Sequence, residues 1–150
     1  MIDASGTWTT PGPAGAGGLP ALGEKTASDR ITYRVPDLED PAVRARYAGK
    51  HTAVIGSGAS AFTALAYLAD LATSNDGTGT KAVWTLRRGI SGSTFGGGEA
   101  DQLPARGALG LAAKAAVDNG YADAVTGFRT DAIERDANPA WCSSARTVAA

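Results

Sequence analysis

The chain has 150 residues, with 14 Lys and Arg against 15 Asp and Glu, so its formal net charge at pH 7 is −1. This balance excludes a protein that binds duplex nucleic acid through a broad cationic face, and no nucleic-acid partner is expected. The single Cys excludes an internal disulfide framework and any metal site built on two or more thiolates. No apolar run approaches the roughly 20 residues that cross a bilayer, and no basic-then-apolar leader follows Met1. We therefore expect a soluble, reduced, cytoplasmic protein without a membrane partner.

The first third of the chain has little periodic pattern. Residues 3–23 are dense in Gly and Pro, which predicts no regular structure, because Pro lacks a backbone donor and Gly resists ordering. Residues 31–35 alternate apolar and polar side chains, and this alternation predicts a short strand that Pro36 ends. After Pro41, a helix of one or two turns is expected over 42–47.

The rest of the chain alternates between strand and helix patterns. Residues 52–55 are small, apolar and partly β-branched, which predicts a strand buried on both faces. A helix is expected over 62–72, where apolar side chains recur at helical spacing. A strand over 81–86, a helix over 109–119 that Gly120 stops, and a strand over 124–129 follow. This order predicts an α/β fold, a Rossmann-like parallel sheet with flanking helices that is incomplete.

The motif with the clearest chemical meaning lies between the first of these strands and the first long helix. It reads G-S-G-A-S-A and comprises Gly56, Ser57, Gly58, Ala59, Ser60 and Ala61. The first Gly permits a sharp turn, the second has no Cβ to obstruct a phosphate, and the small third position lets the helix pack close to the sheet. Free N–H groups at the helix start would face the ligand. The motif predicts a dinucleotide diphosphate site; the alternative is a glycine-rich turn that only joins strand to helix.

The end of the strand over 81–86 indicates which dinucleotide would bind. Proteins that bind NAD place a carboxylate there for the ribose 2′-hydroxyl, whereas those that bind NADP place Arg near the 2′-phosphate. This chain has Arg87 and Arg88, and no carboxylate until Glu99. Guanidinium groups match phosphate geometry, so we predict NADP as the cofactor. The alternative is a solvated basic pair at a strand end.

Residues 47–61 read Y-x-G-K-x-x-x-V-I-G-x-G-x-S-A, which resembles the NADPH-binding segment of flavin-containing monooxygenases and their bacterial flavoprotein relatives. Residues 2–8, I-D-A-S-G-T-W, are similar to the strand and turn through which the FAD domain of that family leads into its inserted NADPH domain. The resemblance implies three parts. Residues 1–48 would be a remnant of the FAD domain with a Gly/Pro-rich linker, 49–137 an NADP-binding Rossmann-like domain, and 138–150 an unassigned tail.

The resemblance also implies a reaction and a second cofactor. In that family NADPH delivers hydride to FAD, and the reduced flavin reacts with dioxygen to oxygenate a substrate. Gly6 would approach the flavin if an FAD domain were present. The family's own first glycine motif, which holds FAD, does not occur in this sequence, so we expect a fragment that binds FAD only with the missing domain and is not active alone. The alternatives are a stand-alone, non-catalytic nucleotide-binding module and an inactive truncated fragment.

Several other residues are weaker candidates. Ser60 does not lie in a G-x-S-x-G elbow, so it is expected to be a helix residue and not a nucleophile. His51 has no acidic neighbour in sequence and is expected to lie on the surface or at a cap. The glycines at 96–98 are not followed by Lys-Ser/Thr, which excludes a P-loop. That stretch is expected to be either a flexible loop or a loop that faces the nicotinamide. The oligomeric state is left open.

Overall fold

A computed structural model describes residues 11–135 of the chain. The chain forms two compact units. One is the continuous segment Val35–Phe128, and the other is built from the residues on either side of it, ending at Arg34 and resuming at Arg129. No helix of the described residues is long and apolar enough to span a membrane.

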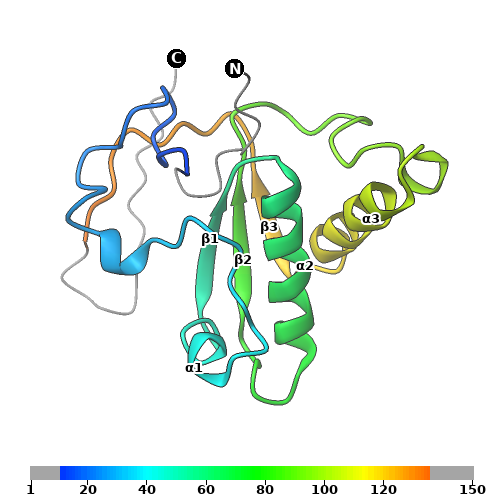
Figure 1. Cartoon of the computed structure of the whole chain (residues 1–150), viewed down its shortest axis with the longest axis horizontal. Coiled ribbons are helices and arrows are strands. Elements are labelled where there is room, and N and C mark those ends of the chain that lie inside the picture. The colour runs from blue at the N-terminus through cyan, green and yellow to red at the C-terminus, as the bar shows by residue number, and fades with distance from the viewer. Residues whose placement is uncertain (1–10, 136–150) are drawn as a thin grey trace, which may run out of the picture. The chain divides into compact units, whose positions relative to one another are not determined.

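The continuous unit is built on a three-stranded parallel sheet (Figure 1). Its strands are β1 (His51–Ile55), β2 (Lys81–Thr85) and β3 (Ala122–Val125), in the spatial order β1-β2-β3. Residues Val54, Trp84 and Ala124 lie side by side across the sheet. The expected parallel sheet is thus confirmed.

Two long helices connect the strands. They are α2 (Ala59–Thr73) and α3 (Pro104–Asp118), while a single turn, α1 (Pro41–Arg44), precedes β1. Helix α2 packs against β1 and β2, α3 packs against β3, and the two helices pack against each other, so both cover the same face of the sheet (Figure 1). This arrangement confirms the α/β class with flanking helices.

The core lies between this face of the sheet and the two helices. Trp84 of β2 and Leu65 of α2 are completely buried, and Ala113 of α3 is as well. Small residues dominate the α3 side of this core, since the buried positions of α3 are Gly107, Gly110, Ala113 and Ala116. The helices can therefore approach the sheet and each other closely.

The expectation that the first strand is buried on both faces is wrong. Only Val54 of β1 is buried, while Ile55 is 47 % exposed and Val125 of β3 is 38 % exposed. The physical reason is that both long helices cover one face, and β1 stands at an edge of the three-stranded sheet. The apolar run in β1 reflects β propensity as well as burial.

A strand over 31–35 is also a wrong prediction. Ile31 has extended dihedral angles (φ −107°, ψ 127°), but no strand forms there, and a short 3₁₀ turn at Ser28–Arg30 precedes it. An alternating pattern fixes which side chains share a face and does not supply a pairing partner. Tyr33, within this segment, bonds instead to the Glu24 carboxylate.

The bounds of two elements, α3 and β3, differ most from the sequence prediction. Helix α3 begins at Pro104, five residues before the expected start, with Pro in the first helical turn, where its missing N–H costs nothing. It ends as predicted before Gly120, which has φ +76°. The N–H groups of Gly120 and Tyr121 then donate to the carbonyls of Val117 and Ala116. Strand β3 follows at once and ends at Val125, two residues before Gly127, where φ is +70°.

The loop after β2 is packed onto α3. A Cβ added at Gly110 would lie 1.9 Å from the Phe95 carbonyl oxygen, and one at Gly107 would lie 2.2 Å from the Gly98 carbonyl oxygen. Asp101 holds the same loop, accepting hydrogen bonds from the Gly97 N–H and from the Arg106 guanidinium. The glycines at 96–98 therefore belong to an anchored loop.

We predict that Gly110→Ala destabilises the protein. Ala favours a helix over Gly by about 1 kcal/mol, but the contact with the Phe95 carbonyl is closer than any real Cβ tolerates, and such overpacking costs about 1–3 kcal/mol. Urea unfolding followed by circular dichroism measures the net loss. Gly92→Ala is the matched control, because nothing lies within 4 Å of its added Cβ. Equal stability of the two variants would contradict the close packing.

Candidate functional site

The turn after β1 is fixed by its bonds to β2. Gly56 has φ +117°, a region that L side chains rarely adopt. Its N–H donates to the Thr85 carbonyl at 3.2 Å, and its carbonyl accepts from Trp84 Nε1 at 2.7 Å. The first glycine of the motif is therefore required by the backbone.

The second glycine lies at the start of α2. Gly58 is the N-cap residue, with φ −89° and ψ 175°, and no side chain caps the helix. Its carbonyl accepts the N–H groups of Ala61 and Phe62. A Cβ added to Gly58 would meet nothing within 4 Å, so neither sterics nor φ requires glycine here. The four residues from Ser57 to Ser60 are all exposed.

The third small position points into the core. Ala61 is 8 % exposed and belongs to the buried cluster between α2 and the sheet. The three positions thus have the properties that the motif predicts, which are a turn with positive φ, an open backbone and close helix–sheet packing. The first N–H groups of α2 have no carbonyl partner within the helix, and the positive end of its dipole faces outward there.

The arginine pair lies at the same edge of the sheet as the turn. Ile55 pairs with Thr85 in the parallel register, so Gly56 lies level with Leu86, and Arg87 and Arg88 begin one residue further on. Both arginines are exposed, whereas Leu86 is buried. The structure therefore brings the motif and the two guanidinium-bearing residues to the carboxyl edge of two neighbouring strands. Ligands of α/β proteins bind at this edge.

The other candidate residues from the sequence lie away from this sheet edge or outside residues 11–135. Gly6 lies outside the described residues, as does Cys142. His51 is exposed at the amino end of β1, the opposite end of the strand from the motif. Within residues 11–135, no group of three His, Cys, Asp or Glu gathers in a way that could hold a metal ion.

Sequence reasoning missed the aromatic cluster beneath the turn. Trp84 packs edge-on against Phe62 at 5.9 Å between ring centroids and against Phe95 at 5.6 Å. The signal was present, since a buried Trp has one N–H that needs an acceptor. Because Trp84 lies near the carboxyl end of its strand, the Gly56 carbonyl in the neighbouring glycine turn could have been predicted as the acceptor of its indole N–H.

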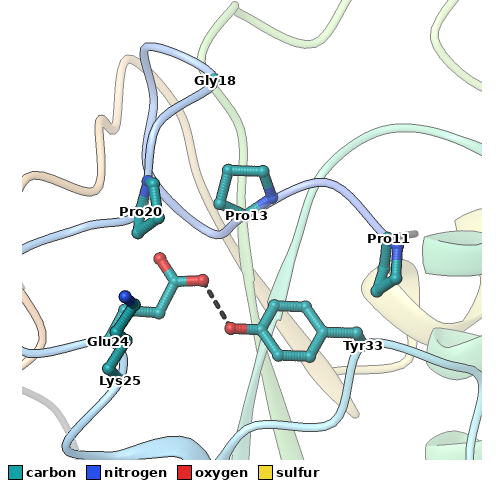
Figure 2. A pocket seen from close by; sticks show the side chains of 7 residues that line it. All are labelled: Pro11, Pro13, Gly18, Pro20, Glu24, Lys25 and Tyr33. Atoms are coloured by element: carbon teal, nitrogen blue, oxygen red, sulfur yellow. Dashed lines mark hydrogen bonds between the residues drawn. The ribbon is translucent and has the colours of Figure 1, made fainter.

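A pocket of about 400 Å³ lies in the other unit and includes none of the motif residues (Figure 2). Three prolines, a glycine and three residues with polar side chains line it; they are Pro11, Pro13, Pro20, Gly18, Glu24, Lys25 and Tyr33. Figure 2 shows the Glu24 carboxylate and the Tyr33 hydroxyl pointing toward each other. The Tyr33 hydroxyl donates to Glu24 Oε1 at 2.5 Å.

The Glu24 carboxylate organises the Gly/Pro-rich segment around this pocket. Its side chain is nearly buried, and it accepts from the N–H groups of Ala14 and Ala21 as well as from Tyr33. Burial raises the pKa of Glu24, but the hydrogen bonds from Tyr33 and the backbone outweigh it, so this pKa lies below its usual value. The same bond, with burial, raises the pKa of Tyr33 to about 12. Glu24 is thereby an internal anchor whose carboxylate is already bonded on both oxygens.

No family model, no curated protein and no solved structure matches the chain.

We predict that Tyr33→Phe raises the pKa of Glu24, because the variant keeps the burial and loses a donor to the charged form. Because the pKa of Glu24 is lower in the folded protein than in the unfolded chain, its carboxylate stabilises the fold at pH values above the unfolded pKa. This contribution is lost as the pH falls through the folded pKa. In the variant this contribution to the free energy of unfolding is therefore smaller. Its loss begins near the unfolded pKa in both proteins and is complete at a higher pH in the variant. Carbon-13 NMR of the glutamate carboxyls across the acid range measures the shift. Tyr67→Phe, on half-exposed α2 surface, is the control, and an unchanged Glu24 pKa in Tyr33→Phe would contradict this role.

Proposed function

We propose that residues 35–128 bind NADP, with the diphosphate on the turn and helix start at 56–61 and the 2′-phosphate at Arg87 and Arg88. The observation that carries this proposal is the meeting of an uncapped helix start, an open glycine and two exposed arginines at one sheet edge. A turn that only joins a strand to a helix would not need these three features at the same place.

The topology supports a Rossmann-like assignment. The spatial order β1-β2-β3, with both connecting helices on one face, corresponds to the 3-2-1 half of the dinucleotide-binding order 3-2-1-4-5-6. In that fold the glycine motif follows the first strand, as it does here after β1. Within the described residues the sheet has three strands, so the assignment covers one mononucleotide-binding half.

The residues at the turn fit a diphosphate by their chemistry. The N–H groups at the start of α2 are donors without side-chain competition, because Gly58 offers no capping oxygen. Negative charge is stabilised at this end of a helix by about 0.3–1 kcal/mol. The space around the Cβ position of Gly58 is open, which lets phosphate oxygens approach the backbone.

The choice of NADP over NAD rests on the arginines. A 2′-phosphate carries two negative charges that a carboxylate would repel and a guanidinium binds bidentately. The first carboxylate after β2 is Glu99, which lies in the 3₁₀ turn Gly98–Ala100 and not at the strand end. We therefore expect discrimination between the two dinucleotides to come from Arg87 and Arg88.

The reaction follows from the family resemblance alone. When bound, NADPH supplies a hydride, and in flavin-dependent oxidoreductases and monooxygenases FAD receives it. Residues 35–128 would bind and orient the nucleotide for that transfer. We infer that this chain is the NADPH-binding portion of such a system, with a stand-alone nucleotide-binding module as the alternative. Yellow colour and NADPH oxidation when the chain is combined with an FAD-binding domain favour the first, and NADP binding that such a domain leaves unchanged favours the second.

We predict that Gly58→Ser weakens NADP⁺ binding and leaves the fold intact. The added Cβ meets nothing within 4 Å, and Ser is at least as good an N-cap as Gly. Its side chain would obstruct the phosphate and accept the N–H groups that the phosphate needs, so affinity should fall roughly tenfold or more. Calorimetric titration with NADP⁺ and a thermal melt measure the two effects. Gly92→Ser is the control, since its Cβ position is equally open. Unchanged affinity in Gly58→Ser would contradict the phosphate site.

We predict that Arg87→Ala combined with Arg88→Ala raises the dissociation constant of NADPH much more than that of NADH. Charge-assisted hydrogen bonds contribute about 1.5–3 kcal/mol, which corresponds to a selective loss of roughly tenfold or more. Fluorescence titration with both reduced dinucleotides measures the ratio. Lys114→Ala on α3, which also removes a positive charge, is the control and should change neither constant. Equal losses for NADPH and NADH in the double variant would contradict the assignment.

A further inference from the structure

We propose that the indole N–H of Trp84 sets the orientation of the Gly56–Ser57 peptide and thereby points the Ser57 N–H at the bound diphosphate. Trp84 is a positioning residue in this account, because it is completely buried beneath the turn and acts through the Gly56 carbonyl. This role rests on the proposed function and adds to it a residue that lies outside the glycine motif.

Both backbone groups of Gly56 are held by consecutive residues of β2. The Gly56 N–H donates to the Thr85 carbonyl at 3.2 Å, which continues the sheet pairing one residue beyond β1. The Gly56 carbonyl accepts from Trp84 Nε1 at 2.7 Å, which is a side-chain bond and not part of the sheet ladder. The position of the indole therefore decides where this carbonyl points.

The direction of the carbonyl fixes the direction of the next N–H. In a trans peptide the C=O of one residue and the N–H of the next lie in one plane and point in opposite directions, and the described residues contain no cis peptide. Since the Gly56 oxygen faces the buried indole, the Ser57 N–H faces away from it. Ser57 is exposed, and no residue of the described segment accepts a hydrogen bond from its N–H.

This orientation needs a bond to hold it. Gly56 tolerates many backbone angles because it has no Cβ, so the peptide that it shares with Ser57 can rotate at little steric cost. Rotation would turn the Gly56 oxygen toward an arriving phosphate, where the partial charge of the oxygen and the charge of the phosphate repel. The apparent dissociation constant varies inversely with the fraction in the competent orientation. One net hydrogen bond changes that fraction roughly two- to tenfold.

Two phenylalanines hold the indole in place. Phe62, in the first turns of α2, meets it at an interplanar angle of 75°, and Phe95 of the loop after β2 meets it at 47°. Phe62 and Phe95 also stack on each other at 6.0 Å. The ring cannot turn its N–H elsewhere without displacing both, so the cluster ties the peptide orientation to the same helix whose first N–H groups complete the site.

The test replaces Trp84, in the full chain, by β-(3-benzothienyl)alanine, which keeps the bicyclic shape and has sulfur in place of N–H. We expect the dissociation constant of NADP⁺, measured by calorimetry, to rise roughly two- to tenfold. The Gly56 carbonyl carbon should change its chemical shift, and the Ser57 amide should respond less to inorganic pyrophosphate. Replacement by 5-fluorotryptophan keeps the N–H and should bind as the wild type does. Leu68→Val, in the core of α2, is the control for lost stability and should leave the dissociation constant unchanged.

The outcomes separate this role from the proposed function. If the wild type binds NADP⁺ and the benzothienyl variant binds it equally well, the role of Trp84 is overturned and NADP binding stands. An equal loss of NADP⁺ affinity in Leu68→Val also overturns the role of Trp84, because the loss of affinity is then explained by lost stability. If the wild type gives no heat with NADP⁺ and its Ser57 amide does not respond to pyrophosphate, both the proposed function and the role of Trp84 are overturned.

Discussion

The attachment of Gly56 to β2 is the constraint on which the sheet-bearing unit depends. Here β1 ends, the chain turns with φ +117°, and α2 begins three residues later. Because both backbone groups of Gly56 are bonded to β2, the axis of α2 is set relative to the sheet, and Ala61 and Leu65 enter the core. Within residues 11–135, the N–H groups at 57–60 have no hydrogen-bond acceptor. Packing and the candidate site thus have one common origin.

The sequence predicted those parts of the fold in which local pattern and tertiary packing agree. The strand at β1, the helix at α2 and the stop at Gly120 follow from apolar spacing and from the backbone freedom of glycine, and the structure has all three. Residues 31–35 show the limit of such reasoning. Their alternation favours extended backbone, but a strand requires a neighbour, and the sequence does not say which segment that is.

The candidate site also has a part that the sequence predicted and a part that it did not. The residues of the motif were predictable because their spacing encodes a turn, an open backbone and a close helix. The partner of the Gly56 carbonyl was not, since Trp84 lies 28 residues away and reaches it only through the parallel pairing of β1 with β2. Likewise, the glycines at 107 and 110 have low helix propensity, so the sequence gives no reason for them. The structure gives the reason, because the loop at 95–98 packs against both.

We propose that an anionic ligand binds at the carboxyl edge of β1 and β2 and not in the proline-lined pocket beside Glu24. Nitrogen-15 amide spectra of the full chain, recorded as NADP⁺ is added, test this most directly. The account predicts saturable shifts at Ser57, Gly58, Ala59 and Ser60, with Glu24, Lys25 and Tyr33 unaffected. Shifts confined to the pocket residues, or none at 57–60, would contradict it.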